Sequence, residues 1–365
     1  MTRRAVLVLA AAALCGSPAA AGDGIQLSIG GSPLQLTLEW SGGQPDFQIL
    51  RGSNPSTAAG VENLRAVTSG FDWTEEPNRP PSGEGLYYLV AETNLAAGGF
   101  PDQWINGEDC VTEPQIQVHQ YNANTFILRQ SMCTNFEGPF IHLLFGEDKV
   151  LMEDTGAGGI QIADTVYAII DQWLFDNGKA SIELIVAHSH AHGDHIAGDG
   201  QFAAQPNTTL VGLSPTAVAS FFGITHWPEE IVEYDLGGRV LDVIPIPGHQ
   251  VASIALYDRQ TGILFTGDTQ YAGRCYIFDS FTDYHDSVQR MVDFVADKPV
   301  VWVLGTHIEM TNTPYQDFPF GSTYHPDEHS LELRREHLQE LLEGVEAMAD
   351  APFVDAHRDF IIVPF

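Results

Sequence analysis

The chain carries the stretch Ala187-His188-Ser189-His190-Ala191-His192-Gly193-Asp194-His195-Ile196-Ala197-Gly198, directly after the apolar run Ile182-Glu183-Leu184-Ile185-Val186. Four histidines and one aspartate fall within eight residues of this stretch. Buried imidazoles and carboxylates need partners, and divalent cations bind both kinds of group. The stretch therefore predicts a metal site at the end of a buried strand.

Spacing within the stretch divides these side chains into two groups. His190 and His192 are two residues apart, so on an extended segment their imidazoles point the same way and can share one metal ion. Asp194 and His195 follow Gly193, where the chain can turn into a helix and face a second metal ion. We interpret His188 as a histidine of the core or of the ligands' surroundings, without direct metal contact.

Further candidate ligands follow other apolar strands. Asp154 follows residues 150–153, His249 follows 243–248, Asp268 follows 263–267 and His307 follows 301–306. The ends of neighbouring strands in an α/β sheet meet at one edge, where their polar groups form a common site. A carboxylate such as Asp268 can bridge two cations. The sequence therefore predicts a two-metal site assembled from several strand ends.

Several motifs of the chain resemble those of the metallo-β-lactamase superfamily, and they come in that family's order. They are Asp154-Thr155-Gly156, His190-x-His192-x-Asp194-His195, Pro247-Gly248-His249, Thr266-Gly267-Asp268-Thr269 and Gly305-Thr306-His307. The resemblance implies an α/β fold, an αββα sandwich, with two zinc ions per chain at one edge and iron or manganese as alternative metals. It implies that His190, His192 and His249 hold the first metal ion. Asp194, His195 and His307 would hold the second, Asp268 would bridge the two, and Asp154 would be a buried support.

The ligand set with Asp268 looks like that of the glyoxalase II, lactonase and phosphodiesterase branches. It implies a hydrolase that cleaves an ester, lactone, thioester or amide bond with a metal-bound hydroxide, oriented by Asp194. Three alternatives stay open: a phosphodiesterase, a β-lactamase of the same fold, and a diiron redox or metal-binding protein. No Gly-x-Ser-x-Gly motif of a serine hydrolase occurs in the sequence.

The chain is strongly acidic. It holds 48 Asp and Glu against 16 Lys and Arg, for a formal net charge of −32. Such a surface repels phosphate backbones and anionic lipids, so we expect neither nucleic acid nor a membrane surface as a partner. We expect a small-molecule substrate that is uncharged or not strongly anionic, which makes glutathione thioesters a poor fit. The sequence leaves the oligomeric state open.

The first residues have the features of a signal peptide. Arg3 and Arg4 precede an apolar run over residues 5–14, and Ala19-Ala20-Ala21 fits a cleavage site. The run is about half the length of a membrane span, so we expect cleavage after residue 21 and a secreted or periplasmic protein. In an oxidising compartment, Cys110 and Cys133 can form a disulfide that leaves Cys275 over, although sequence alone does not fix the pairing.

Residues 22–93 differ in pattern from the rest of the chain. Short runs of alternating polarity, separated by turn-rich segments, predict a small β-sandwich. Leu38-Glu39-Trp40, Phe47-Gln48-Ile49-Leu50-Arg51 and Tyr87-Tyr88-Leu89-Val90 resemble strands of bacterial fibronectin type III domains. We expect this domain to act as a spacer or docking module. Residues 94–114 would be a packed linker, and residues 115–365 would form the hydrolase domain.

Strands and helices alternate in the predicted hydrolase domain. Apolar runs predict strands at 126–129, 140–145, 150–153, 182–187, 209–212, 240–246, 254–257, 262–265 and 300–304. Helical periodicity predicts one helix over 163–177 and another over 327–349, whose apolar stripe from Leu331 to Val345 would face the core. Six further residues are candidates for roles near the site: Glu309 would support a ligand and the other five would line the substrate pocket, with salt bridges, surface positions or helix caps as the alternative. They are Tyr271, Arg274, Glu309, Tyr324, His325 and His329.

Overall fold

The computed structural model describes six strands between residues 26 and 92, residues 95–348 and residues 351–365. The predicted signal peptide, residues 1–21, lies outside the described residues. By its contacts, the chain divides into two units. The first unit comprises residues 1–98, 260–262 and 295–301, and the second comprises 99–259, 263–294 and 302–365.

The first unit contains two antiparallel three-stranded sheets. One sheet has the order β1-β2-β5, with β1 at Gln26–Ser32, β2 at Gln35–Ser41 and β5 at Asp72–Glu75. The other has the order β4-β3-β6, with β3 at Phe47–Gly52, β4 at Leu64–Thr68 and β6 at Tyr87–Glu92. The short helix η3 (Val295–Asp297) also belongs to this unit. The likeness of this region to fibronectin type III domains stays a prediction, as do the domain limits.

The second unit is built around two six-stranded sheets. The first sheet has the order β12-β11-β10-β9-β8-β7, and its three strands β10, β11 and β12 run parallel. Its strands are β7 (Ile116–Asn122), β8 (Thr125–Gln130), β9 (Phe140–Phe145), β10 (Lys149–Glu153), β11 (Glu183–Ala187) and β12 (Thr208–Leu210).

The second sheet has the order β13-β14-β15-β16-β18-β19, in which β16 and β18 run parallel. Its strands are β13 (Val232–Asp235), β14 (Val240–Pro245), β15 (Ile254–Asp258), β16 (Ile263–Gly267), β18 (Trp302–Gly305) and β19 (Glu332–Leu333). A small third sheet has the order β17-β21-β20, formed by β17 (Arg274–Ile277), β20 (Asp355–Ala356) and β21 (Ile361–Pro364).

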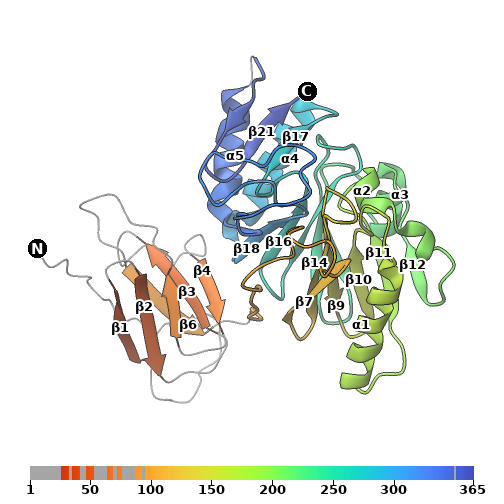
Figure 1. Cartoon of the computed structure of the whole chain (residues 1–365), viewed down its shortest axis with the longest axis horizontal. Coiled ribbons are helices and arrows are strands. Elements are labelled where there is room, and N and C mark those ends of the chain that lie inside the picture. The colour runs from red at the N-terminus through yellow and green to blue at the C-terminus, as the bar shows by residue number, and fades with distance from the viewer. Residues whose placement is uncertain are drawn as a thin grey trace, which may run out of the picture. The chain divides into compact units, whose positions relative to one another are not determined.

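Helices flank the two large sheets, as Figure 1 shows for α1 to α3 on one side and α4 and α5 on the other. They are α1 (Ile162–Asp176), α2 (Gly193–Ile196), η2 (Asp199–Gln201), α3 (Pro215–Phe222), α4 (Phe281–Phe294) and α5 (Arg335–Ala347). Helix α1 packs Val166, Ile170 and Trp173 against the first sheet. A second apolar core includes Ile185 of the first sheet and Phe265 and Leu304 of the second. The α/β class is therefore confirmed.

Most predicted elements of the second unit lie where the sequence placed them, but the predicted start of the last helix was wrong. The helix expected from residue 327 begins only at Arg335. Asp327 has φ +56, and Glu332 and Leu333 pair with Leu304 and Val303 as strand β19. A left-handed residue and this pairing with a distant strand exclude the predicted first turns. Leu338, Leu341, Leu342 and Val345 are buried as expected, while Leu331 reaches the core from outside the helix.

The segment between the strands of the first unit and β7 is packed, as predicted. Trp104 is buried and meets Phe140 edge-on at 4.9 Å. Cys110 forms a disulfide with Cys133, which confirms that pairing, and Cys275 stays a buried free thiol. Among the described residues, no helix combines the length and apolar character that crossing a membrane requires.

Arg239 ties the two large sheets together at their buried ends. Its guanidinium contacts both carboxylate oxygens of Asp258, at 2.6 Å and 3.2 Å. It also donates to the backbone carbonyls of Asn124 and Phe145, at 2.5 Å and 3.2 Å, and to the hydroxyl of Thr125. Both Arg239 and Asp258 are buried. Because the guanidinium spans both sheets, it fixes how they stack.

We expect Arg239→Met to lower the free energy of unfolding by about 3–5 kcal/mol, because it removes the guanidinium that pairs with the buried Asp258 carboxylate. Urea denaturation measures this loss. The matched control is Arg358→Met, which removes an exposed guanidinium that lies 3.6 Å from the half-buried Asp359 and should change stability by less than about 1 kcal/mol. Equal losses in the two variants would contradict a special role for Arg239.

Candidate metal centre

Three histidines converge on one point beside the C-terminal end of β11. His190 and His192 come from the loop between β11 and α2, and His249 follows β14. Nε2 of His190 lies 2.9 Å from Nδ1 of His192, and Nε2 of His249 lies 3.2 Å and 3.1 Å from those same two atoms. His190 and His249 are buried and His192 is half-buried. We call these three residues the first cluster.

The short distances between the three imidazole nitrogens of the first cluster suit a bound cation better than hydrogen bonds among the three rings. In the ring plane, each imidazole nitrogen carries either a hydrogen or a lone pair. Among three mutually close nitrogens, at least two are therefore of the same kind, and one contact has no hydrogen bond. Two nitrogens bound to one tetrahedral zinc at about 2.0–2.1 Å lie about 3.3 Å apart. The observed separations are close to that value, so this donor set fits a zinc ion.

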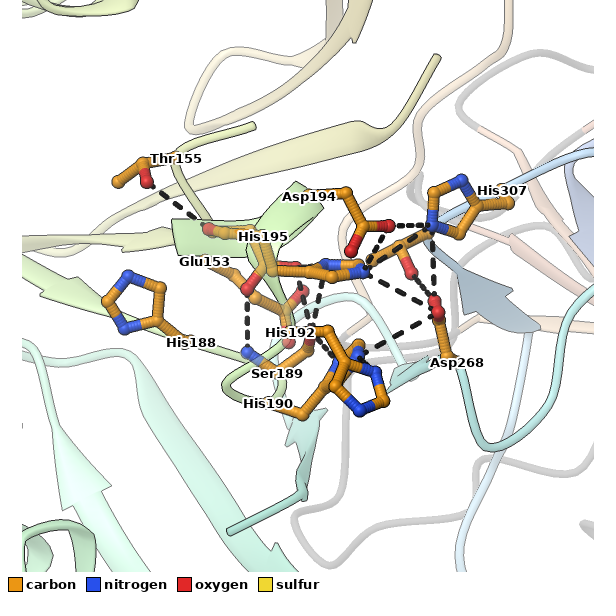
Figure 2. Close-up of polar contacts among 12 residues, drawn as sticks. Glu153, Thr155, His188, Ser189, His190, His192, Asp194, His195, Asp268 and His307 are labelled. Atoms are coloured by element: carbon orange, nitrogen blue, oxygen red, sulfur yellow. Dashed lines mark hydrogen bonds and ion pairs between the residues drawn. The ribbon is translucent and has the colours of Figure 1, made fainter. Parts of the chain in front are cut away.

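A second cluster lies beside the first and contains Asp194, His195, His307 and Asp268. Oδ2 of Asp194 is 3.2 Å from Nε2 of His195 and 3.3 Å from Nε2 of His307 (Figure 2). The two histidine nitrogens are 3.4 Å apart. Two imidazoles and two carboxylates form the mixed nitrogen and oxygen set that zinc, iron and manganese accept.

The carboxylate of Asp268 faces the nitrogens of both clusters. Its Oδ1 lies 3.4 Å from Nε2 of His307, and its Oδ2 lies 3.5 Å from Nε2 of His195. Towards the first cluster, Oδ2 lies 3.8 Å from Nε2 of His190 and 3.7 Å from Nε2 of His249. The hydroxyl of Thr306 donates a hydrogen bond to Oδ1. This is the placement that a carboxylate bridging two cations requires.

Two glycines allow the segments that carry Asp268 and His249 to pack closely against their neighbours. Gly267 has φ +52, and a Cβ there would lie 2.7 Å from the Cβ of Ser189. Gly248 has φ +133, and a Cβ there would lie 2.3 Å from backbone atoms of Tyr284. A side chain at Gly267 would push the segment that carries Asp268 away from Ser189, and one at Gly248 would push the segment that carries His249 away from α4.

Asp154 is fully buried behind the clusters and holds the loop that supplies four of the seven residues. Its Oδ1 accepts the backbone N–H of Ser189 at 2.8 Å. Its Oδ2 accepts the hydroxyl of Ser189 and Nδ1 of His195, both at 2.7 Å. Because Nδ1 of His195 is engaged in this way, its Nε2 faces the second cluster (Figure 2).

Backbone carbonyls orient two of the remaining histidines. Nδ1 of His249 donates to the carbonyl of Tyr276 at 2.8 Å, and Nδ1 of His307 donates to the carbonyl of Glu137 at 2.9 Å. Sequence reasoning missed both carbonyls, because any residue type supplies a carbonyl and no side-chain pattern marks it. His188 lies outside both clusters, as predicted, and its Nε2 is 2.8 Å from Oδ1 of Asp199.

The charges of the two clusters differ. Burial lowers the pKa of His249 to about 4, and burial together with the charge of His195 lowers the pKa of His190. Burial opposes the charged form of His307 too, but Asp268 and Asp194 outweigh it and raise the pKa to about 10. His190 and His249 therefore present free lone pairs, whereas a cation entering the second cluster displaces protons.

Glu309 and the five candidates for the pocket lie outside both clusters. Glu309 accepts hydrogen bonds from the hydroxyl of Tyr271 at 3.0 Å and the guanidinium of Arg274 at 2.7 Å. The ring centroid of Tyr271 lies 5.7 Å from that of His307. The group of Tyr271, Arg274 and Glu309 therefore packs against one histidine of the second cluster. His325 stacks on Phe318 at 4.0 Å, His329 contacts Asp359 at 3.2 Å, and Tyr324 is exposed.

Comparison with known proteins matches residues 136–307 to the model of the Metallo-beta-lactamase superfamily. A hydroxyacylglutathione hydrolase of Idiomarina loihiensis is 31% identical over 129 residues, which cover 35% of this chain and 45% of that protein. The acyl-coenzyme A thioesterase MBLAC2 of Bos taurus is 29% identical over 201 residues, which cover 46% of this chain and 72% of the thioesterase. The chain therefore spans less than half the length of the first relative.

The solved structures with a similar fold include a metallo-beta-lactamase from Pontibacter korlensis. It is 15% identical to this chain, covers 64% of this chain and 99% of its own, and has a TM-score of 0.42. By the family model, residues 136–307 match the Metallo-beta-lactamase superfamily, and the chain has hydrolases among its relatives.

We expect Asp154→Asn to weaken zinc binding by about 10- to 100-fold, because it turns one acceptor of the Ser189 and His195 hydrogen bonds into a donor. Competition with a chromogenic chelator measures this affinity. Asp164→Asn, the same change at an exposed position on α1, should leave the affinity unchanged. Wild-type zinc affinity in a folded Asp154→Asn protein would contradict the supporting role.

Proposed function

We propose that this chain, in which residues 136–307 match the metallo-beta-lactamase superfamily and carry both clusters, is a dinuclear zinc hydrolase. Its substrate would be a small uncharged molecule with a carboxylic ester, lactone, thioester or amide bond. The observation that carries the proposal is the position of the Asp268 carboxylate, within 4 Å of histidine nitrogens in both clusters. The relatives support the hydrolase reaction and a thioester bond, since they include hydroxyacylglutathione hydrolases and acyl-coenzyme A thioesterases.

Each group of residues in the site would have its own role in a hydrolysis. Two divalent cations, when bound, supply Lewis acidity that lowers the pKa of water and polarises a carbonyl oxygen. His190, His192 and His249 would hold the first cation with three donors, which leaves a coordination position for a reactant. Asp194, His195 and His307 would hold the second, and Asp268 would keep the two cations close together.

Asp194 is the carboxylate that reactants reach. It is half-buried, whereas Asp268, His195 and His307 are buried. Burial opposes ionisation of Asp194, but His195 and His307 outweigh it and hold its pKa well below the usual range. An ionised carboxylate at the rim accepts a hydrogen bond from the attacking water and orients it towards the carbonyl carbon.

The acidic surface favours substrates without negative charge. The chain has three times as many acidic as basic residues, with 48 against 16. Arg274, the cation on β17, is already bound to Glu309 at 2.7 Å and Asp317 at 2.5 Å. A strongly anionic conjugate would therefore meet repulsion near this strand.

We also propose export to the periplasm or the medium, with residues 1–21 as the signal peptide. The Cys110–Cys133 disulfide supports this, because disulfides persist in oxidising compartments. N-terminal sequencing of the mature protein from a cell fraction measures the cleavage site.

We expect the purified protein to bind about two zinc ions per chain and to hydrolyse one class within a panel of chromogenic esters, lactones and thioesters. His190→Ala and His307→Ala should each retain about one zinc ion and lose at least about 100-fold in kcat/KM. Elemental analysis and initial rates measure these quantities. His226→Ala is the matched control, because His226 is exposed and outside both clusters.

Two results would contradict the proposal. One is less than about one metal ion per chain after zinc reconstitution, with His190→Ala unchanged in metal content. The other is a site that selects iron and consumes oxygen without hydrolysing any member of the panel. Turnover of phosphodiesters or β-lactams alone would retain the metal site and replace the substrate class.

A further inference from the structure

An exposed phenylalanine lies directly beside the first cluster. Phe278 follows β17, and its ring centroid is 5.3 Å from that of His249 and 5.7 Å from that of His192. The carbonyl of Tyr276, two residues earlier, accepts the hydrogen bond from Nδ1 of His249. The same short segment therefore orients a candidate metal ligand and presents an aromatic ring next to it.

Phe278 is part of a stack of three rings, which we call the aromatic face: Tyr276, Phe278 and Phe365. Phe278 stacks on Tyr276 at 5.1 Å and on Phe365 at 5.0 Å, with interplanar angles of 18° and 27°. Phe278 is 45% exposed and Phe365 is 81% exposed. Exposed apolar patches on soluble proteins commonly mark binding sites.

Strand pairing builds the aromatic face, so its position relative to the first cluster is fixed. Tyr276 and Ile277 of β17 pair with Val363 and Pro364 of β21. The backbone N–H of Phe365 donates to the carbonyl of Ile277 at 3.1 Å, which places its ring beside Phe278.

The charges around the aromatic face do not suit an anion. The guanidinium of Arg274, on the same strand, is bound by the carboxylates of Glu309 and Asp317. Asp279, directly after Phe278, turns its carboxylate to the backbone N–H of Val251 at 2.8 Å. A flat ring without charge matches both the stacked geometry and this acidic edge.

We propose that the aromatic face binds an uncharged aryl group of the substrate and so places a carbonyl, a few atoms away, at the first cluster. The placement of a carbonyl at the first cluster rests on the proposed hydrolase function, whereas binding of an aryl ring to the aromatic face does not. The contact between Phe278 and two cluster histidines leaves room for only a short linker between ring and carbonyl. An arylacetyl or arylpropionyl ester meets this description.

The first test is binding of benzylacetone, a ketone that carries an aryl group and a carbonyl but no leaving group. Isothermal titration of the full-length zinc-loaded protein should show benzylacetone binding at least about tenfold more tightly than butanone, which lacks the ring. Phe278→Ala should weaken benzylacetone binding by about tenfold and leave butanone unchanged, because only the stacking contact is lost. Phe278→Trp should restore the preference.

The matched control is Phe175→Ala, because Phe175 is 82% exposed on α1 and lies outside the aromatic face. Phe365→Ala is a second variant of the face that removes an even more exposed ring and should act in the same direction as Phe278→Ala. Equal affinity for benzylacetone and butanone, or equal losses in Phe278→Ala and Phe175→Ala, would overturn the proposal. So would a dimer in sedimentation that Phe278→Ala dissociates, because a second copy would then cover the face.

A second measurement separates this proposal from the proposed function. Phenylacetate and acetate esters of one chromogenic alcohol should differ by about tenfold in kcat/KM, with the difference lying in KM and lost in Phe278→Ala. Ring-dependent binding of benzylacetone without turnover of either ester would refute the placement of an ester carbonyl at the first cluster and support the aryl site. Turnover of both esters at equal kcat/KM, without ring-dependent binding, would refute the aryl site and leave the hydrolase function intact.

Discussion

The carboxylate of Asp154 sits fully buried at the end of β10 and accepts three hydrogen bonds from the loop that follows β11. A buried carboxylate is unfavourable unless such donors satisfy it, so the loop has one arrangement that the core tolerates. In that arrangement, Asp154 binds Ser189 through its backbone N–H and its hydroxyl, and it orients the ring of His195 through the hydrogen bond from Nδ1. The left-handed backbone of Asp154, with φ +69, adds strain that these hydrogen bonds offset. The loop is thereby shaped for a cation by the protein itself.

The two clusters exist only where the two sheets meet. The first sheet supplies His190, His192, Asp194 and His195, and the second supplies His249, Asp268 and His307. A backbone hydrogen bond of 2.8 Å from Ile254 to the carbonyl of Ser189 joins the sheets next to the clusters. Arg239 joins them through Asn124 and Phe145. The spacing of the candidate ligands is therefore a property of sheet packing, which links the stability of the fold to the geometry of the site.

The sequence indicated the residues that the structure brings together in the two clusters, because their signal was local. Four cluster residues lie within one strand-to-helix connection, and His249, Asp268 and His307 each follow an apolar strand and a glycine, so their types and positions were readable. Sequence reasoning failed where a distant partner decides the structure. Glu332 and Leu333 join β18 as a strand, although their neighbours in sequence favour a helix. The sequence did not indicate a role for Phe278, because that role depends on contacts with His249 and Phe365, which are far from it along the chain.

Chemistry and recognition have different physical sources in this fold, and β17 connects them. The clusters consist of residue types that the cation chemistry requires, so they say little about which molecule enters. In the proposed function, recognition depends on what surrounds them: an acidic surface, an arginine already paired with Glu309 and Asp317, and stacked rings beside the first cluster. Strand β17 contributes to both, since the carbonyl of Tyr276 orients His249 while the next exposed side chain, Phe278, meets the solvent. A substitution on this strand can thus change substrate preference without removing any candidate ligand, provided that it preserves the backbone.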